Sequence, residues 1–505
     1  MADTKREIER KYEATPGTPL PDLRKVSGVS DVVGKGVAEL DAVYYDTADL
    51  RLAAAAITLR RRTGGADAGW HLKLPVARGV RDEITAPLSD LLPDRLAALV
   101  RAHTRNADVV PVVRLLSSRD VLHLVDADGA LLAELSRDAV VAKRLTDGNR
   151  TAQWDEIEVE LADGGDPAFL DAVDKKLRKA GVLPADSPSK LARALAETGS
   201  VPEERPAARA PKAAGDHVLA YLRDKRDALV ANDPGVRRDL PDAVHQMRVA
   251  TRRLRSAFRS YGKVVDRAVT DPLADELKWL AAELGVARDH EVLSERLRSR
   301  VDALPDTLVL GPVHARLRIR SAGGGAEAQK RAVAALDSER YLALLDALDT
   351  LLADPPLRKA ASRPPEDVMA KAVLKDYARL STRVEHALDL PPGRERDLAM
   401  HDARKAAKRA RYAAEAARPA LGKAAKRFAK RMKAVQNLLG EHQDSVVARE
   451  VLRDLAIQAH AAGETAFTWG LLYGQEQAGA ADSERELPEV WQRASRPKMR
   501  AALAG

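Results

Sequence analysis

The pattern of apolar and polar positions divides the chain into two parts with different periods. From Met1 to about Ser200, short segments alternate apolar and polar residues and are bounded by Gly, Pro and Asp, which predicts strands. Further along, apolar residues recur at helical spacing, as in the stripe Met247, Ala250, Leu254 and Ala257, which predicts amphipathic helices. The pattern therefore predicts an α+β multidomain chain, with a sheet-forming domain followed by an all-α domain.

The alternating segments carry charge on the face opposite their apolar residues. The first segment places Glu7, Glu9 and Lys11 on one face, and the last places Glu156 and Glu158 on one face. The segments between them contribute mostly Arg and Lys: Arg60, Arg62, Lys73 and Arg81. A solvated antiparallel sheet alternates in the same way. If the sheet instead closes with its charged face inward, it forms a tunnel in which carboxylates suited to Mg²⁺ or Mn²⁺ face a basic wall suited to phosphates.

The helical part contains a basic stripe that occurs twice. In VHQMRVATRRLR and in MHDARKAAKRAR, basic residues follow the histidine at i+3, i+7 and i+10, so that they share one helical face. The shared positions are His245, Arg248, Arg252 and Arg255 in one copy and His401, Arg404, Lys408 and Arg411 in the other. A Leu-Gly pair follows each copy, at Leu284 and at Leu439. We interpret this as an internal duplication over about 215–300 and 366–455.

The basic stripe is more consistent with an anion site than with a solvated face. Charge runs on helices usually face water, but these stripes lack interleaved acids, and like charges at i+3 or i+4 cost about 0.2–0.5 kcal/mol per pair. A row of guanidinium and ammonium groups suits a chain of phosphates. Only 4% of the residues are aromatic and no nucleic-acid-binding motif occurs, so no specific nucleic acid is expected. His245 and His401 have no second metal ligand at i+3 or i+4.

These helical motifs resemble the CHAD domain, the conserved-histidine α-helical domain. Besides the duplicated stripe, a lysine, Lys278 or Lys433, precedes each Leu-Gly pair, and the resemblance spans about 215–495. It implies a pseudo-dimer of helical bundles that binds inorganic polyphosphate. The residues that it implicates are His245, Arg248, Arg252, Arg253, Arg255, Lys278, His401, Arg404, Lys408, Arg409, Arg411 and Lys433.

The amino-terminal part, over about residues 4–198, resembles the CYTH domain of triphosphate tunnel metalloenzymes. The resemblance rests on Glu-x-Glu-x-Lys at residues 7–11, on Leu-Arg-x-Arg, on Arg81-x-Glu83 and on the closing Ser189-Lys190. It implies metal ligation by Glu7, Glu9, Glu156 and Glu158, with Glu7, Glu9 and Lys11 as catalytic residues. The phosphate contacts that it implies are Arg60, Arg62, Lys73, Arg81, Arg114, Arg119 and Lys190.

Two positions depart from the family pattern. Where many members have Lys-x-Arg, this chain has Ser117-Ser118-Arg119, so Arg114 is expected to supply the missing charge. The acidic position after the following strand is filled by either Glu134 or Asp138, and the sequence leaves both open.

The resemblances imply metal-dependent hydrolysis of inorganic triphosphate, supported by Mg²⁺ or Mn²⁺, with polyphosphate held by the helical domain. Such catalysis is mostly positioning and electrostatics, so no nucleophilic Ser or Cys is required. Two alternatives stay open: a non-catalytic polyphosphate-binding protein targeted to granules, and a nucleotide cyclase or organic triphosphatase.

Composition sets the limits of this interpretation. With 505 residues, several domains are expected: 1–199, a Pro- and Ala-rich linker at 200–214, and 215–498. A net charge of +8 agrees with a polyanionic partner such as polyphosphate or short linear phosphates. The chain has no Cys and no run of 18 apolar residues, so we expect a cytoplasmic protein, including on polyphosphate granules, with no membrane partner. The oligomeric state is left open.

Overall fold

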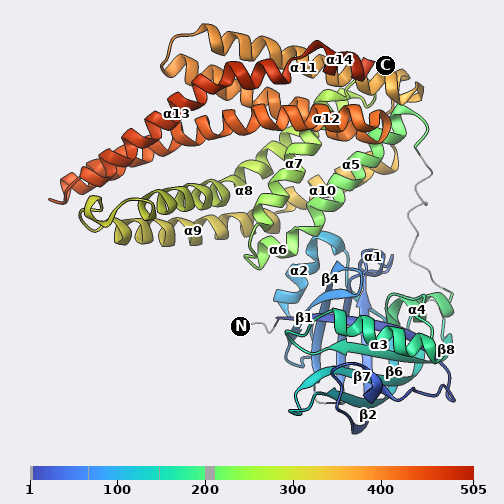
Figure 1. Cartoon of the computed structure of the whole chain (residues 1–505). Coiled ribbons are helices and arrows are strands. Elements are labelled where there is room, and N and C mark those ends of the chain that lie inside the picture. The colour runs from blue at the N-terminus through green and yellow to red at the C-terminus, as the bar shows by residue number, and fades with distance from the viewer. Residues whose placement is uncertain (1–3, 66, 147, 200–210, 505) are drawn as a thin grey trace. The chain divides into compact units, whose positions relative to one another are not determined.

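The chain separates into two compact units, Met1–Ala207 and Ala208–Gly505 (Figure 1). The computed structural model describes residues 4–65, 67–146, 148–199 and 211–504. Most of the predicted linker, residues 200–210, lies outside the described residues, and the first helix after it begins at Ala214.

The first unit is built on a closed barrel of antiparallel strands, which confirms the predicted fold class. Around the barrel the order is β1-β5-β4-β3-β2-β6-β7-β8. The strands are β1 (Thr4–Ala14), β2 (Asp31–Asp46), β3 (Thr58–Thr63), β4 (Gly69–Ala77), β5 (Val80–Ala86), β6 (Val110–Val125), β7 (Leu131–Arg144) and β8 (Thr151–Leu161). Closure follows from β1, which pairs with β5 through its first half and with β8 through its second half.

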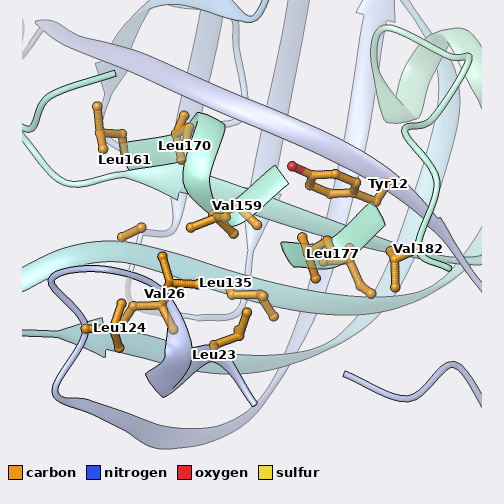
Figure 2. Packing of buried hydrophobic residues seen from close by; sticks show 14 residues of the cluster. Tyr12, Leu23, Val26, Leu124, Leu135, Val159, Leu161, Leu170, Leu177 and Val182 are labelled. Carbon is orange, nitrogen blue, oxygen red and sulfur yellow. The ribbon is translucent and has the colours of Figure 1, made fainter. Parts of the chain in front are cut away.

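The barrel has apolar residues on its outer surface, and helices cover them. These helices are α1 (Arg51–Ala54), α2 (Asp94–Thr104) and α3 (Ala168–Lys179). Tyr12 and Val159 of the strands pack against Leu170 and Leu177 of α3 (Figure 2). On another side of the barrel, Trp70, Leu72 and Leu74, which share one face of β4, pack against α1 and α2. Where a helix covers the apolar face of a strand on the outside, the charged face of that strand points into the barrel.

One end of the barrel interior is filled by helix α4 (Lys190–Glu197). Ser189 caps this helix by accepting a hydrogen bond from the Ala192 amide at 3.1 Å. Leu191 and Leu195 on its buried face pack against inward-alternating residues such as Leu115 and Trp154. The first turn of α4 therefore presents Lys190 to the barrel interior.

The second unit is all-helical, as predicted. Its helices are α5 (Ala214–Ala231), α6 (Asp233–Arg237), α7 (Ala243–Ser260), α8 (Arg267–Asp302), α9 (Val313–Asp337), α10 (Glu339–Ala353), α11 (Pro365–Asp389), α12 (Arg394–Ala461), α13 (Phe467–Ala494) and α14 (Pro497–Ala504). The apolar faces of α8 and α9 meet those of α12 and α13 in one core that contains Leu297, Leu317, Leu452 and Trp469.

Helix α12 is a hairpin of two arms that turn at Gly422. This glycine has φ 54° and ψ −127°, values that lie outside the helical region and suit a residue without a Cβ. Contacts across the turn join Arg411 to Gln436 and Arg404 to Asp444, so the arms run antiparallel. The first arm carries the second basic stripe, just as α7 carries the first. The second arm corresponds to α8, whose Gly285 carbonyl accepts a hydrogen bond from Arg248 at 3.2 Å.

Candidate functional site

The barrel contains a polar cavity of about 330 Å³. Cations and carboxylates are equally numerous among the described lining residues. The cations are Lys5, Lys11, Arg60, Arg62, Lys73, Arg81, Arg119 and Lys190, and the acids are Glu7, Glu9, Asp67, Glu83, Glu134, Glu158, Glu160 and Asp163. A cavity lined in this way suits a ligand that itself combines positive and negative charges, such as a metal-bound phosphate.

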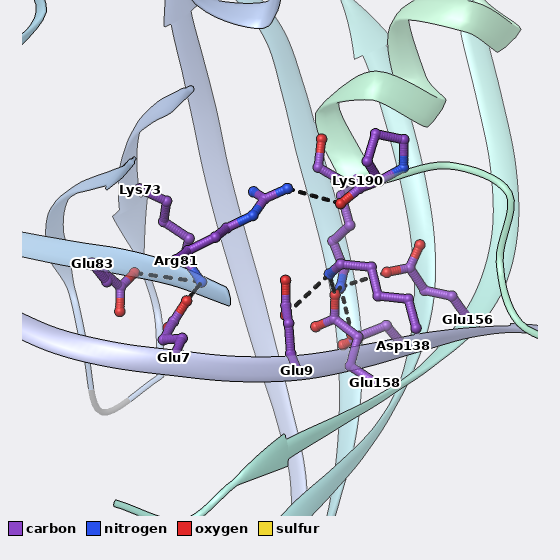
Figure 3. Close-up of polar contacts among 12 residues, drawn as sticks. Glu7, Glu9, Lys73, Arg81, Glu83, Asp138, Glu156, Glu158 and Lys190 are labelled. Carbon is purple, nitrogen blue, oxygen red and sulfur yellow. Dashed lines mark hydrogen bonds and ion pairs between the residues drawn. The ribbon is translucent and has the colours of Figure 1, made fainter. Parts of the chain in front are cut away.

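A group of buried carboxylates lies on neighbouring strands β7 and β8. Ligand oxygens of Asp138, Glu156 and Glu158 lie within 4.8 Å of one another. The ammonium of Lys190 contacts all three, at 3.0, 2.6 and 2.7 Å respectively (Figure 3). The indole of Trp154 donates a hydrogen bond to Glu156 at 2.7 Å and orients it. The position among these oxygens therefore favours a cation.

Glu9 joins this group through Lys11. The Lys11 ammonium contacts both Glu158 and Glu9, the latter at 3.2 Å, because Lys11 lies opposite Glu158 in the β1–β8 register. Burial raises the pKa of Glu158, but Lys11, Lys190 and Arg119 outweigh it and hold that pKa well below its usual range. Glu158 is therefore ionised at neutral pH.

Glu7 occupies a second acidic position, on the side of the cavity formed by β4 and β5. Its carboxylate lies 2.5 Å from the Lys73 ammonium, and Glu83 lies 3.7 Å from the same group (Figure 3). Burial raises the pKa of Glu7 to about 7, Lys73 lowers it, and Glu83 adds to the rise. The four glutamates predicted as metal ligands are thus divided. Glu156 and Glu158 lie together and Glu9 is joined to them through Lys11, whereas Glu7 lies apart with Lys73.

Guanidinium groups form the basic wall of the cavity. Arg119 donates to both oxygens of Asp138, at 2.7 and 2.9 Å, and to Glu158 at 2.9 Å. Arg60 donates to the hydroxyl of Tyr44 at 3.3 Å. Burial, and next the charges of Arg60 and Arg119, lower the pKa of Arg62 to about 9. This crowding of positive charge favours the binding of an anion.

Two predicted phosphate contacts differ in their placement. Arg81 lines the cavity and donates a hydrogen bond to the Pro188 carbonyl at 2.8 Å. Arg114 does not line the cavity, so the expectation that it supplies the missing charge there is corrected. Its exposed guanidinium instead donates a hydrogen bond to Asp41 at 2.9 Å. Residues five apart on a strand point to opposite faces, so Arg114 points outward where Arg119 points inward.

The two acids that the sequence left open lie in different places. Asp138 is completely buried in the carboxylate group, whereas Glu134 lines the cavity and pairs with His123 at 3.3 Å. No role was predicted for Tyr44 or for Glu83. Both could have been found from strand alternation, because Glu83 shares a face with Arg81 and Tyr44 lies directly opposite Arg60.

The carboxylate group on β7 and β8 fits a hard divalent cation. Asp138, Glu156 and Glu158 offer only oxygen donors, which Mg²⁺ and Mn²⁺ prefer. These three carboxylates would hold the ion in the position that the Lys190 ammonium occupies. Glu9 lies nearby, because the Lys11 ammonium contacts both Glu9 and Glu158.

The duplicated stripes meet in the helical unit. We define the basic cluster as Arg248 and Arg252 of α7 with Arg404 and Lys408 of α12. Burial, and next the charges of Arg404 and Arg252, lower the pKa of Lys408 to about 7. The buried Nε atoms of Arg252 and Arg404 have no hydrogen-bond partner among the described residues. The basic cluster therefore lacks sufficient negative charge of its own.

The other predicted polyphosphate contacts lie around the cluster. Arg253 and Arg411 share Glu415, at 3.1 and 3.0 Å. Arg409 contacts Asp376 of α11 at 2.8 Å and donates to the Arg259 carbonyl, so it links helices. Burial lowers the pKa of Arg255 and of His401. The remaining three are His245, which is half-buried, and Lys278 and Lys433, which are exposed.

Comparisons with known proteins identify both units. Residues 5–195 match the CYTH domain, and residues 220–453 match the CHAD domain. The uncharacterized protein Rv2226 of Mycobacterium tuberculosis (strain ATCC 25618 / H37Rv) is 40% identical over 501 residues, which are 96% of this chain and 95% of that protein. The chain belongs to the family of proteins in which a CYTH domain, the fold of triphosphate tunnel metalloenzymes, precedes a CHAD domain, as both resemblances predicted.

Solved structures are similar to each unit. PptA from Streptomyces chartreusis is 21% identical and covers 55% of this chain and 99% of its own, with a TM-score of 0.47. The CHAD domain from the plant Ricinus communis is 26% identical and covers 58% and 92%, with a TM-score of 0.41. HpAC1 from Hippeastrum, which has a dominant triphosphatase activity, is 15% identical and covers 41% and 99%, with a TM-score of 0.23.

Within the described residues, no helix combines the length and the apolar character needed to cross a bilayer.

Proposed function

We propose that the barrel hydrolyses inorganic triphosphate with the help of Mg²⁺ or Mn²⁺, and that the helical unit binds inorganic polyphosphate. The observation that carries the first half is a cavity of about 330 Å³ in which Glu158, one of a group of three close carboxylates, lies with Arg60, Arg62 and Arg119. One wall suits a divalent cation, and the other suits phosphate oxygens.

Each wall has its own part in the reaction. When bound, the metal ion would neutralise phosphate oxygens and lower the pKa of an attacking water. The guanidinium groups of Arg60, Arg62 and Arg119 bind the phosphates and stabilise the charge that develops on the leaving group. Lys73 on β4 and Arg81 on β5 add further positive charge to the cavity lining, so a linear phosphate chain is held along the cavity.

Arg119 and Arg114 form a matched pair for testing this assignment. Arg119→Gln is expected to lower kcat/KM for phosphate release from tripolyphosphate by about 10²- to 10³-fold, because it removes a charged donor from the cavity. Arg114→Gln removes the same charge from the outer face of the same strand and should leave the rate within twofold. Initial rates of phosphate release measure both, and equal rates for the two variants would exclude this role for Arg119.

The polyphosphate assignment rests on the basic cluster in the CHAD domain. Four cations converge there, and buried guanidinium nitrogens lack partners among the described residues. A chain of phosphates supplies both the charge and the acceptors. Because the two domains are covalently joined, polymer held by one would raise the local concentration of phosphate chains for the other.

Lys408 makes polyphosphate binding depend on pH. A lysine in an unfolded chain titrates near pH 10.4, whereas the pKa of Lys408 is lowered to about 7, so at about pH 8 it is mainly neutral. Polyphosphate favours its charged form, so binding should take up protons, and affinity should fall as the pH rises from 7 to 9. Titration calorimetry in two buffers of different ionisation enthalpy measures this uptake. Lys408→Met should take up fewer protons than the wild type, and buffer-independent heats for the wild-type protein would contradict the prediction.

A non-catalytic polyphosphate binder is the alternative that the basic cluster alone would support. It predicts polymer binding without phosphate release from any triphosphate. A nucleotide cyclase or an organic triphosphatase predicts turnover of ATP or of thiamine triphosphate ahead of tripolyphosphate.

A further inference from the structure

A second set of metal-ligand side chains lies in the helical unit, outside the basic cluster. Asp397 is on the first arm of α12, His442 is on the second arm, and Glu484 is on α13. Their ligand atoms lie within 4.8 Å of one another. The Nε2 atom of His442 is 3.2 Å from Asp397 Oδ1 and 3.4 Å from Glu484 Oε1. Three separate segments therefore bring one nitrogen and two oxygens to a common point.

Two arginines orient the carboxylates of this set. Arg449 donates a hydrogen bond to Asp397 Oδ2 at 3.3 Å, and Arg396 lies 3.3 Å from Glu484 Oε2. Each arginine uses the carboxylate oxygen that faces away from the imidazole. The other two oxygens, Oδ1 and Oε1, are left directed at His442. Outer contacts that fix the orientation of ligands in this way are characteristic of metal sites in proteins.

The imidazole is poorly satisfied among the described residues. His442 is 0% exposed, and neither of its ring nitrogens has a hydrogen-bond partner of acceptable geometry among the described residues. A buried polar group without a partner costs stability. A metal ion at the common point would satisfy Nε2 and compensate both carboxylates at once. Asp397 and Glu484 are 21% and 15% exposed, so an ion can reach the point from solvent.

The set is not part of the duplicated pattern. His442 lies two residues after Gly440, and the residue two after Gly285 in the first repeat is Ala287. Asp397 lies four residues before His401, and the residue four before His245 is Pro241. Residues two apart on a helix point in different directions, so His442 contacts Glu484 of α13 while Asp444 contacts Arg404 of the basic cluster. The set is therefore separate from the repeated anion site.

We propose that Asp397, His442 and Glu484 form a site for one divalent transition-metal ion, such as Zn²⁺ or Mn²⁺, that fastens both arms of α12 to α13. A nitrogen together with two carboxylate oxygens suits these ions, whereas Mg²⁺ prefers oxygen ligands alone. The remaining coordination positions would be taken by water.

Zinc binding by the full-length, chelator-treated protein tests this proposal. Bound zinc per chain is measured by equilibrium dialysis and elemental analysis for the wild type and for His442→Leu. Because the barrel carboxylates can also bind zinc, both proteins are compared again in a Glu158→Gln background. His442→Leu should lose one equivalent of zinc in both backgrounds, and His386→Leu, which changes an exposed histidine of α11, should lose none.

A second readout separates metal binding from a purely structural ion-pair network. Zinc should raise the unfolding temperature of the wild-type protein in a concentration-dependent way, and this shift should shrink in Asp397→Asn, which keeps the shape of the side chain. Arg449→Met should weaken zinc binding by about 10- to 100-fold by leaving Asp397 less well oriented. If the folded His442→Leu and Asp397→Asn variants both bind as much zinc as the wild type, the set is an ion-pair network and the proposal is wrong.

Discussion

Replacing Glu158 by glutamine is expected to reduce metal-dependent phosphate release from tripolyphosphate by at least about a hundredfold. Changes to residues that only orient metal ligands commonly cost 10- to 100-fold, and Glu158 is one of the carboxylates that would hold the ion. It also contacts Lys11, Lys190 and Arg119, so its loss leaves three cations undercompensated. Initial rates over a range of Mg²⁺ and Mn²⁺ concentrations measure the effect, and thermal unfolding shows whether the variant is folded.

Asp41→Asn is the matched control for this variant. Asp41 is a carboxylate of the same barrel, but it pairs with Arg114 on the outside, so its amide variant should keep the wild-type rate. Glu9→Gln should behave like Glu158→Gln, since Glu9 is joined to the same group through Lys11. If the folded Glu9→Gln and Glu158→Gln variants both keep full activity, the cavity is excluded as the site of hydrolysis.

The double variant Arg252→Gln, Arg404→Gln is expected to weaken polyphosphate binding by about a hundredfold at low salt. A hydrogen bond to a charged group contributes about 1.5–3 kcal/mol, and this variant removes one such donor from each copy of the basic stripe. The dependence of log Kd on log salt should also become shallower, because fewer counterions are released on binding. Fluorescence anisotropy with end-labelled polyphosphate at several salt concentrations measures both effects.

Arg298→Gln serves as the control for surface charge. This arginine of α8 is exposed and pairs with Glu295 at 2.7 Å, so its loss changes the net charge without touching the basic cluster. Exposed ion pairs contribute little to stability, so the variant should fold normally. Its affinity for polyphosphate and the salt dependence of that affinity should stay close to those of the wild type. Equal losses in the double variant and in Arg298→Gln would mean that polyphosphate responds only to overall charge.

Alternation along a strand indicates which of its residues share a face. Glu7, Glu9 and Lys11 share one face of β1, and all three line the cavity. The reason is physical: a strand whose other face is apolar has only one orientation that buries that face, and the covering helices accept it on the outside of the barrel.

Long-range pairing could not be predicted in the same way. Asp138 joins Glu156 and Glu158 because of the register between β7 and β8, which places Asp138 opposite Glu156. Nothing local in the sequence distinguishes it from Glu134. Arg114 was expected in the cavity because of its charge and its nearness to Arg119 in the sequence. Strand alternation places it on the outer face instead.

The helical unit shows a similar division. The period of the two stripes predicted one basic face on each helix, but the convergence of Arg248 and Arg252 with Arg404 and Lys408 depends on how α7 packs against α12. Arg409 is adjacent to Lys408 in sequence, yet it points away to Asp376. A position on a charged segment is therefore weaker evidence for binding than a place on the shared face.

The most direct test of the account is phosphate release by the full-length protein from tripolyphosphate, ATP and thiamine triphosphate, each assayed with Mg²⁺ and with Mn²⁺. We expect metal-dependent release that is fastest with tripolyphosphate and is lost on chelation. Polyphosphate binding without release from any of the three substrates would contradict the proposed hydrolysis, and faster turnover of ATP or of thiamine triphosphate would contradict the proposed substrate.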